Sequence, residues 1–258
     1  MADISISSMD HELKPLHIVH GNGKLSCCAV PWRDAAVSSG VVLDESEFGG
    51  EAEAILFALA VAVEQRDRQT AGHCERLAWI AVALGTAMGL DRTSLVALYR
   101  GGYLHDVGKV GIPDRILFKP AELDSDEWMI MRAHPVRGEE ICRPMKALAP
   151  VLPIIRHHHE RWDGSGYPDG LRGSLIPITA RVLQIADIYD ALTSPRPYKP
   201  AFSDAKALQI MSQETAKGWR DPELTQLFFR VHRETITKMP DSFGSVPGSL
   251  ANLRQMVS

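Results

Sequence analysis

The chain has few cysteines and no long apolar run. It contains four cysteines, of which Cys27 and Cys28 are adjacent, so neither a disulfide framework nor a zinc ribbon built on paired C-x-x-C motifs is expected. No run of about 18 apolar residues occurs, and no apolar segment follows a basic N-terminus, so the sequence predicts neither a membrane span nor a signal peptide. These absences favour a location in the reducing cytoplasm.

An excess of positive charge is also missing. The chain carries 28 Lys and Arg against 32 Asp and Glu, which gives a formal net charge of −4. Binding to the phosphate backbone of a nucleic-acid polymer depends on many basic side chains, so this charge balance argues against such a partner. An anionic substrate must instead be attracted by a local positive field, which bound metal ions could supply.

Apolar residues at helical spacing dominate the chain between residues 51 and 239. A hydrophobic content of 45% in 258 residues is enough to bury a sizeable core. From Glu51 onward the apolar residues recur at intervals of three and four, which is typical of amphipathic helices. We therefore predict an all-α helical bundle over residues 51–239. Residues 1–50 are expected to form a small irregular N-terminal extension, either partly disordered or a clipped regulatory segment, and residues 240–258 a C-terminal tail.

Three large apolar residues lie in a helix that is predicted over residues 123–133. Trp128, Met129 and Met131 are interpreted as core or packing residues and not as part of a cofactor site. His134 follows this helix directly and precedes Pro135. Because a proline interrupts a helix, His134 is expected at a helix end.

The segment of residues 157–168, with the sequence HHHERWDGSGYP, is the most unusual in the chain. Side chains of consecutive helical residues leave the axis about 100° apart, so three adjacent histidines cannot all enter one apolar core. At least one of them should face a polar cavity. The Gly164-Ser165-Gly166 turn ends the helix and allows the chain to fold back over the histidines. This pattern predicts a metal site covered by a loop.

Other residues of the metal-ligand type come from separate predicted helices. His105 and Asp106 are adjacent at the end of an apolar helix, an arrangement that suits an aspartate bridging two ions. A hydrogen-bonded core pair is the alternative for an isolated His-Asp sequence. Asp187 and Asp190 interrupt a strongly apolar helix, where buried carboxylates need partners. Asp190 is expected to orient a histidine or a basic residue. His73, near a helix start, could equally be a surface imidazole.

Three motifs together resemble the HD-GYP family, a branch of the HD phosphohydrolases whose known members hydrolyse cyclic dinucleotides. The motifs are HDVGK at residues 105–109, the run from His158 to Pro168, and ALTSPRPYK at residues 191–199. The resemblance covers roughly residues 60–235 and implies an HD-type helical bundle. It also implies hydrolysis of cyclic di-GMP to linear pGpG and on to GMP, as part of bacterial second-messenger signalling.

The resemblance further implies a site for two divalent metal ions. The implied ligands are His73, His105, Asp106, His134, His158, His159 and Asp187. Gln69 stands where some members of the family carry a glutamate for a third metal, so two ions are expected rather than three. A ligand set of histidines and carboxylates without cysteine suits iron or manganese, with zinc as a further option.

The resemblance also implies five residues that act on the substrate. Lys109 and Asp106 are the implied catalytic residues, and Lys109, Tyr167, Arg196 and Lys199 are the implied substrate contacts. For Arg196 and Lys199 the alternative is a solvated basic turn.

Two other functions stay open at the level of the sequence. One is an HD phosphohydrolase for another nucleotide, such as cyclic GMP-AMP, and the other is a non-catalytic signalling or docking module. Seven intact ligand positions argue against the docking module, because it has no need of them. Besides the cyclic dinucleotide, the expected partners are signalling proteins and a second copy of the chain in a homodimer.

Overall fold

The computed structural model describes residues 51–66, 72–195 and 200–238. Every regular element in these three ranges is a helix, which confirms the predicted all-α class. None of the described helices is long and apolar enough to cross a membrane. The predicted extension (residues 1–50) and tail (residues 240–258) lie outside the described residues, so both stay predictions.

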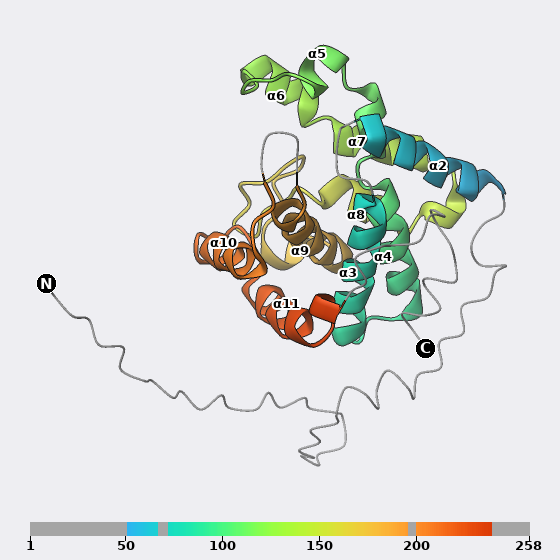
Figure 1. The fold of residues 1–258 in the computed structure, drawn as a ribbon. Helices are drawn as coiled ribbons and strands as arrows, with labels where there is room; N and C mark the ends of the chain where they lie inside the picture. Colours follow the sequence, from blue (N-terminus) through green and yellow to red (C-terminus); the bar gives the residue numbers. More distant parts are fainter. Residues whose placement is uncertain (1–50, 67–71, 196–199, 239–258) are drawn as a thin grey trace, which may run out of the picture.

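The helices form a bundle around α3, α4 and α9, with α5 and α6 projecting at one end (Figure 1). The α-helices are α2 (Glu51–Arg66), α3 (His73–Ala87), α4 (Arg92–Leu104), α5 (Asp114–Leu117), α6 (Ser125–Met131), α7 (His134–Cys142), α8 (Leu152–His157), α9 (Ile178–Thr193), α10 (Asp204–Ala216) and α11 (Pro222–Glu234). Short 3-10 segments are η2 (Val107–Gly111), η3 (Lys146–Leu148), η4 (Gly173–Leu175) and η5 (Ile236–Lys238).

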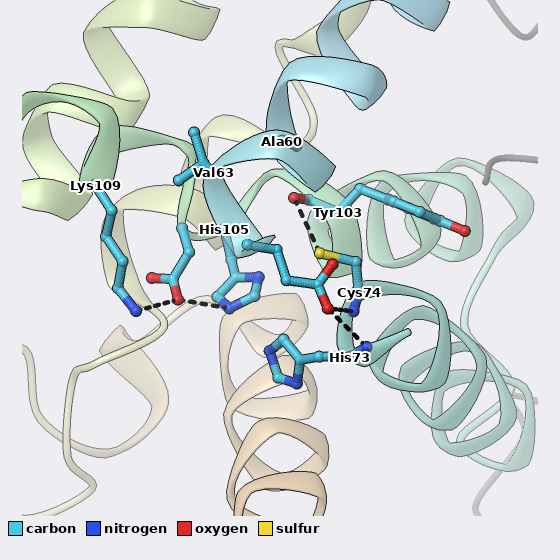
Figure 2. A pocket seen from close by; sticks show the side chains of 9 residues that line it. Ala60, Val63, His73, Cys74, Tyr103, His105 and Lys109 are labelled. Atoms are coloured by element: carbon cyan, nitrogen blue, oxygen red, sulfur yellow. Dashed lines mark hydrogen bonds and ion pairs between the residues drawn. The ribbon is translucent and has the colours of Figure 1, made fainter. Parts of the chain in front are cut away.

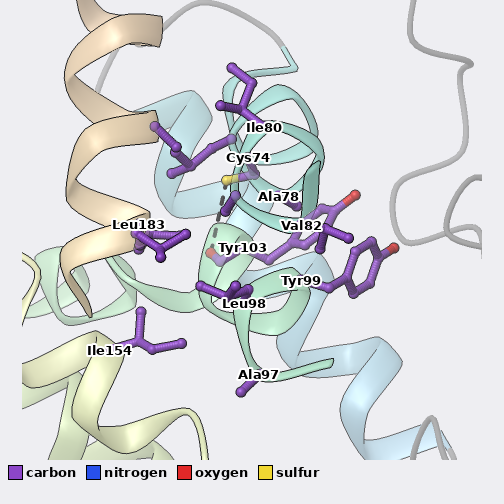
Figure 3. Packing of buried hydrophobic residues seen from close by; sticks show 14 of the residues in the cluster. Cys74, Ala78, Ile80, Val82, Ala97, Leu98, Tyr99, Tyr103, Ile154 and Leu183 are labelled. Atoms are coloured by element: carbon purple, nitrogen blue, oxygen red, sulfur yellow. Dashed lines mark hydrogen bonds between the residues drawn. The ribbon is translucent and has the colours of Figure 1, made fainter. Parts of the chain in front are cut away.

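Glycines on α4 let this helix approach its neighbours closely. A Cβ atom added at Gly102 would lie 2.5 Å from the Cα atom of Ala78 on α3, and one added at Gly101 would lie 2.8 Å from the Ile154 side chain on α8. Figure 3 shows the surrounding core, in which Leu98, Ala78, Ile154 and Leu183 meet. The close packing brings the C-terminal end of α4 beside α3 and α8, and the residues that follow α4 carry the His-Asp pair.

Helix α6 does not pack as its sequence predicted. Trp128 is 44% exposed and Met129 is 67% exposed, and no residue of α6 is buried. The interpretation of these two residues as core is therefore wrong. The physical reason is position, because α6 lies at the projecting end of the bundle (Figure 1), where the central core does not reach it. The start of α6 is as expected, since Asp124 caps it and forms a capping box with Glu127.

The position of His134 is also corrected. His134 does not end a helix but begins α7, and Pro135 occupies the first turn of that helix. Proline is favourable there because the amide hydrogens of a first turn have no partner within the helix.

Candidate metal centre

Helix ends bring six of the seven predicted ligands together with Asp187, which lies within α9. His73 is the first residue of α3, His105 and Asp106 directly follow α4, His134 begins α7, His158 and His159 directly follow α8, and Asp187 lies within α9. Their ligand atoms form two clusters, each within 4.8 Å: Asp106, His134, His158 and His159 in cluster A, and His73, His105 and Asp187 in cluster B. All seven implied metal ligands are thus found in the two clusters.

Asp106 lies between the two clusters and faces each of them with a different oxygen. Its Oδ2 atom is 3.3 Å from Nε2 of His105 in cluster B. Its Oδ1 atom is 3.1 Å from Nε2 of His134 and 3.7 Å from Nε2 of His158 in cluster A. A carboxylate that reaches both clusters has the arrangement of a ligand shared by two ions.

Main-chain carbonyls fix the tautomer of three of these histidines. The Nδ1 atoms of His134, His158 and His105 lie 2.8, 2.8 and 3.2 Å from the carbonyl oxygen three residues earlier. A carbonyl only accepts hydrogen bonds, so Nδ1 carries the proton in each ring. Each Nε2 atom therefore directs its lone pair toward Asp106, as a metal-binding histidine requires.

His73 is held in the same tautomer by a side chain. Its Nδ1 atom donates to Asp190 Oδ2 at 2.7 Å, while Nε of Arg76 donates to the other oxygen at 2.6 Å. Burial favours the neutral carboxyl, but the hydrogen bonds from His73 and Arg76 outweigh it and lower the pKa of Asp190 to about 2. The prediction that Asp190 orients a histidine or a basic residue is confirmed for both kinds of partner.

Unpaired polar atoms at the centre of the site fit bound cations. Oδ1 of Asp106 and Nε2 of His73 are buried without a hydrogen-bond partner among the described residues. His134 Nε2 lies 3.1 Å from Asp106 Oδ1, but with its proton on Nδ1 it has none to donate. Lone pairs that face a carboxylate in a buried site are unfavourable unless a cation lies between them. The donor set, five imidazoles and two carboxylates, therefore fits divalent metal ions.

The ionisation of the site agrees with this description. Burial lowers the pKa of His158, and burial, with His158 as a close neighbour, holds the pKa of His159 well below its ordinary value, which keeps both rings neutral. Burial also disfavours a charged His105, but the Asp106 carboxylate outweighs it and raises the pKa of His105. Desolvation opposes the ionisation of Asp106, yet Lys109 and His105 hold its pKa well below the usual range. Asp106 is thus held as a carboxylate beside the Lys109 ammonium group.

Lys109 lies at the edge of the two clusters, where its Nζ atom contacts Asp106 Oδ2 at 2.7 Å (Figure 2). It belongs to η2, which packs directly against the start of α7. The glycine of the HDVGK motif makes this contact possible, because a Cβ atom at Gly108 would lie 2.0 Å from the carbonyl oxygen of His134. Gly108 therefore sets the spacing between Asp106 and His134.

Gly108→Ala is expected to destabilise the protein and to disturb the metal site. The added methyl group would meet backbone atoms of α7, which cannot move aside as a side chain can, so we expect a loss of about 1–3 kcal/mol or more in the free energy of unfolding. Gly111→Ala in the same 3-10 segment is the matched control, since its Cβ atom would meet only the flexible Arg137 side chain at 3.3 Å. Urea unfolding of both variants, with metal analysis, tests the difference. Equal stability of the two variants would contradict it.

The glycine-rich loop after α8 folds back over the histidines, as predicted. Gly164 has a φ angle of 84°, and a Cβ atom at Gly166 would lie only 2.2 Å from the backbone nitrogen of Arg161. The loop places the Tyr167 ring on the His159 ring, with the centroids 4.8 Å apart and the planes at 27°. Burial raises the pKa of Tyr167, so its hydroxyl stays protonated at neutral pH.

Two buried carboxylates that support the site were missed in the sequence. Glu160 is 0% exposed and accepts hydrogen bonds from the backbone nitrogens of Asp169 and Leu171, which anchors the loop. Glu64 is 8% exposed and accepts a hydrogen bond from the backbone nitrogen of His73 at 2.8 Å (Figure 2). Glu64 follows Ala60 by one helical turn on the buried face of α2, and this placement of a charge was the available signal.

The remaining residues singled out in the sequence are His157, Gln69 and the two basic residues Arg196 and Lys199. His157 lies outside clusters A and B, with Nδ1 3.6 Å from Asp169. Arg196, Lys199 and Gln69 lie outside the described residues, so their roles stay predictions.

Over the described residues, the helical bundle brings five histidines and two aspartates together, and this defines a helical domain with a candidate binuclear metal centre. The sequence profile of the HD domain family matches residues 58–224, and the chain belongs to this family. The resemblance seen in the three motifs is thereby confirmed.

Several characterised proteins are similar to this chain. A 3'3'-cGAMP-specific phosphodiesterase of Vibrio cholerae is 39% identical over 192 residues, which are 72% of this chain and 37% of that protein. A cyclic di-GMP phosphodiesterase of Thermotoga maritima is 37% identical over 196 residues, which are 73% of this chain and 52% of that protein. The chain therefore spans about half the length, or less, of these relatives.

Solved structures share the fold. A cyclic GMP-AMP specific phosphodiesterase of V. cholerae superposes with a TM-score of 0.59 at 19% identity, covering 79% of this chain and 52% of that one. An HD-GYP type protein of Bdellovibrio bacteriovorus gives a TM-score of 0.52 at 20% identity, covering 64% of this chain and 53% of that one.

Proposed function

We propose that the chain is a metal-dependent phosphodiesterase that hydrolyses cyclic di-GMP. The observation that carries this proposal is the position of Asp106, which faces cluster A with Oδ1 and cluster B with Oδ2. A shared carboxylate between two histidine clusters is the ligand arrangement of two-metal phosphoesterases. The names of the Thermotoga relative and of several other relatives support cyclic di-GMP as the substrate.

His73, His105 and Asp187 would hold one ion, His134, His158 and His159 the other, and Asp106 would be shared. Divalent ions bound there supply Lewis acidity and favour the deprotonation of water. The protein contributes five imidazoles, four of them with a fixed tautomer, and only two carboxylates, so a site loaded with two divalent ions keeps a positive charge of about two and attracts a phosphodiester. The absence of sulfur ligands favours iron or manganese, with zinc as the further option.

The proposed reaction cleaves one phosphodiester bond of the ring at a time. Water adds to phosphorus, the ribose oxygen leaves and takes up a proton, and the product is linear pGpG; a second hydrolysis gives GMP. Lys109 lies where it can neutralise a phosphate oxygen or the leaving oxygen. Arg196 and Lys199 are proposed to hold the other phosphate, and Tyr167 to cover the substrate from the loop side.

The direct test is turnover of a small panel of nucleotides by the full chain loaded with iron or manganese. We expect hydrolysis of cyclic di-GMP with pGpG as the first product. Absence of turnover with every metal, while two equivalents are bound, would contradict an enzymatic function and favour the docking module.

Cyclic GMP-AMP is the second candidate substrate. It is favoured by the 39% identity to the V. cholerae phosphodiesterase that is specific for 3'3'-cGAMP. The ratio of kcat/KM for the two cyclic dinucleotides, measured on one preparation, decides between them.

Lys109→Ala is expected to lower kcat by about 100-fold or more while both metal ions stay bound. The reason is that an ammonium group aimed at charge that develops only in the transition state contributes to kcat and little to KM. Lys119→Ala is the matched control, because Lys119 pairs with Glu127 away from both clusters. Steady-state kinetics with metal analysis checks this, and an unchanged kcat would remove Lys109 from the proposed mechanism.

A further inference from the structure

Trp128 of α6 is connected to the candidate metal centre through Arg132 and Tyr167. Trp128 is 44% exposed, and Arg132 follows it by one helical turn. His134 comes two residues later, and it belongs to cluster A. An exposed indole ring that is connected to the site in this way offers a face on which a planar ligand can stack.

Arg132 joins Trp128 to the loop that covers the histidines. Its guanidinium carbon lies 5.6 Å from the centroid of the Trp128 ring and 5.4 Å from that of Tyr167. Tyr167 in turn stacks on His159 at 4.8 Å. A series of planar groups therefore runs from a candidate metal ligand to the surface of the protein.

The charge of Arg132 is not neutralised by a carboxylate of the described residues. Other arginines near the site differ, since Arg76 pairs with Asp190, and Arg156 pairs with Glu139 and Asp169. A guanidinium group held by aromatic rings alone keeps its N–H edge available to an acceptor on a ligand. An indole face and an available guanidinium edge are together the features that bind a nucleobase.

We propose that Trp128 and Arg132 bind one guanine base of the cyclic dinucleotide, with the base stacked on Trp128 and its O6/N7 edge facing Arg132. The inference rests on the proposed function and names the contact that would select the base. Guanine offers two acceptors on that edge, whereas adenine pairs one acceptor with an amino donor, which a guanidinium group cannot satisfy. Cyclic di-GMP and cyclic GMP-AMP both contain a guanine, so either could use this surface, whereas cyclic di-AMP could not.

Trp128→Ala tests the stacking contact. Loss of one stacked base raises KM for cyclic di-GMP by about 5- to 100-fold. The value of kcat and the metal content stay within about twofold of wild type, because Trp128 contacts the base and not the reacting phosphate. Trp128→Phe keeps most of the affinity. Met129→Ala is the matched control, since Met129 is the next residue on α6 and is 67% exposed.

Arg132 is tested by selectivity. We expect cyclic di-GMP analogues that resist hydrolysis to inhibit wild-type turnover of cyclic di-GMP much more strongly than cyclic di-AMP does. Arg132→Ala should reduce this preference in inhibition about tenfold or more. Arg132→Lys does not restore it, because an ammonium group lacks the planar fork that meets two acceptors. Circular dichroism on each variant verifies that the helices are intact.

The outcomes separate this inference from the proposed function. If wild type cleaves cyclic di-GMP but Trp128→Ala has the same KM as Met129→Ala, the base-binding surface is wrong and the function stands. If wild type neither binds nor cleaves a cyclic dinucleotide with metals loaded, both are wrong. A Trp128→Ala variant that loses metal or kcat instead of affinity also overturns the inference, because it would assign Trp128 a structural role.

Discussion

Asp106→Ala is expected to abolish turnover and to release metal from both clusters. Asp106 faces cluster A at 3.1 Å and cluster B at 3.3 Å, so its removal takes one ligand from each candidate ion. It also removes one of the two carboxylates of a centre whose other ligands are five histidines. We expect kcat/KM to fall by more than about 1,000-fold, which corresponds to at least about 4 kcal/mol of transition-state stabilisation.

Metal analysis and steady-state kinetics on the same preparation test this expectation. Asp114→Ala is a suitable control, because Asp114 is an exposed carboxylate that pairs with Arg66 outside both clusters. If Asp106→Ala retained both ions and the rate of wild type, neither the shared-ligand role nor the assignment of the site could stand. Loss of activity with both ions retained would instead place Asp106 in the chemistry and not in metal binding.

The sequence was most informative where a local rule applies. Helical spacing of apolar residues predicted the all-α class, because a helix that packs on a core must repeat its apolar positions every three or four residues. The adjacent His105 and Asp106 predicted a shared ligand, because neighbouring helical side chains diverge by about 100°. The structure places the two side chains in different clusters and in contact at 3.3 Å, and the shared-ligand role itself stays a prediction.

Other features depend on which segments meet in space. An apolar stripe marks a face of α6 but does not say whether anything covers it, and the exposure of Trp128 and Met129 shows that little does. The proline after His134 was compatible with a helix end and with a helix start, and the structure has the start. Glu64 and Glu160 accept hydrogen bonds from backbone amides of other segments. The spacing of residues along the chain does not predict which segments supply these amides.

The support of His73 distinguishes cluster B from cluster A. His105, His134 and His158 are oriented by main-chain carbonyls, which no side-chain substitution removes. His73 depends on the Asp190 carboxylate, which is itself held by Arg76. The Asp190 side chain therefore controls the tautomer of His73, and this control acts on cluster B and not on cluster A.

Asp190→Ala is accordingly expected to lower the metal affinity of cluster B and to leave that of cluster A unchanged. Removing a carboxylate that orients a metal-binding histidine typically lowers metal affinity by about 10- to 100-fold. We expect the ion of cluster B to be lost first in a chelator titration, with the ion of cluster A retained at the affinity of wild type. Asp190→Asn is the matched variant, because its amide oxygen can still accept from His73 Nδ1 although the charge for Arg76 is gone, and an intermediate loss is expected. Simultaneous release of both ions, or wild-type affinity for both, would show that the two clusters do not bind metal as separate units.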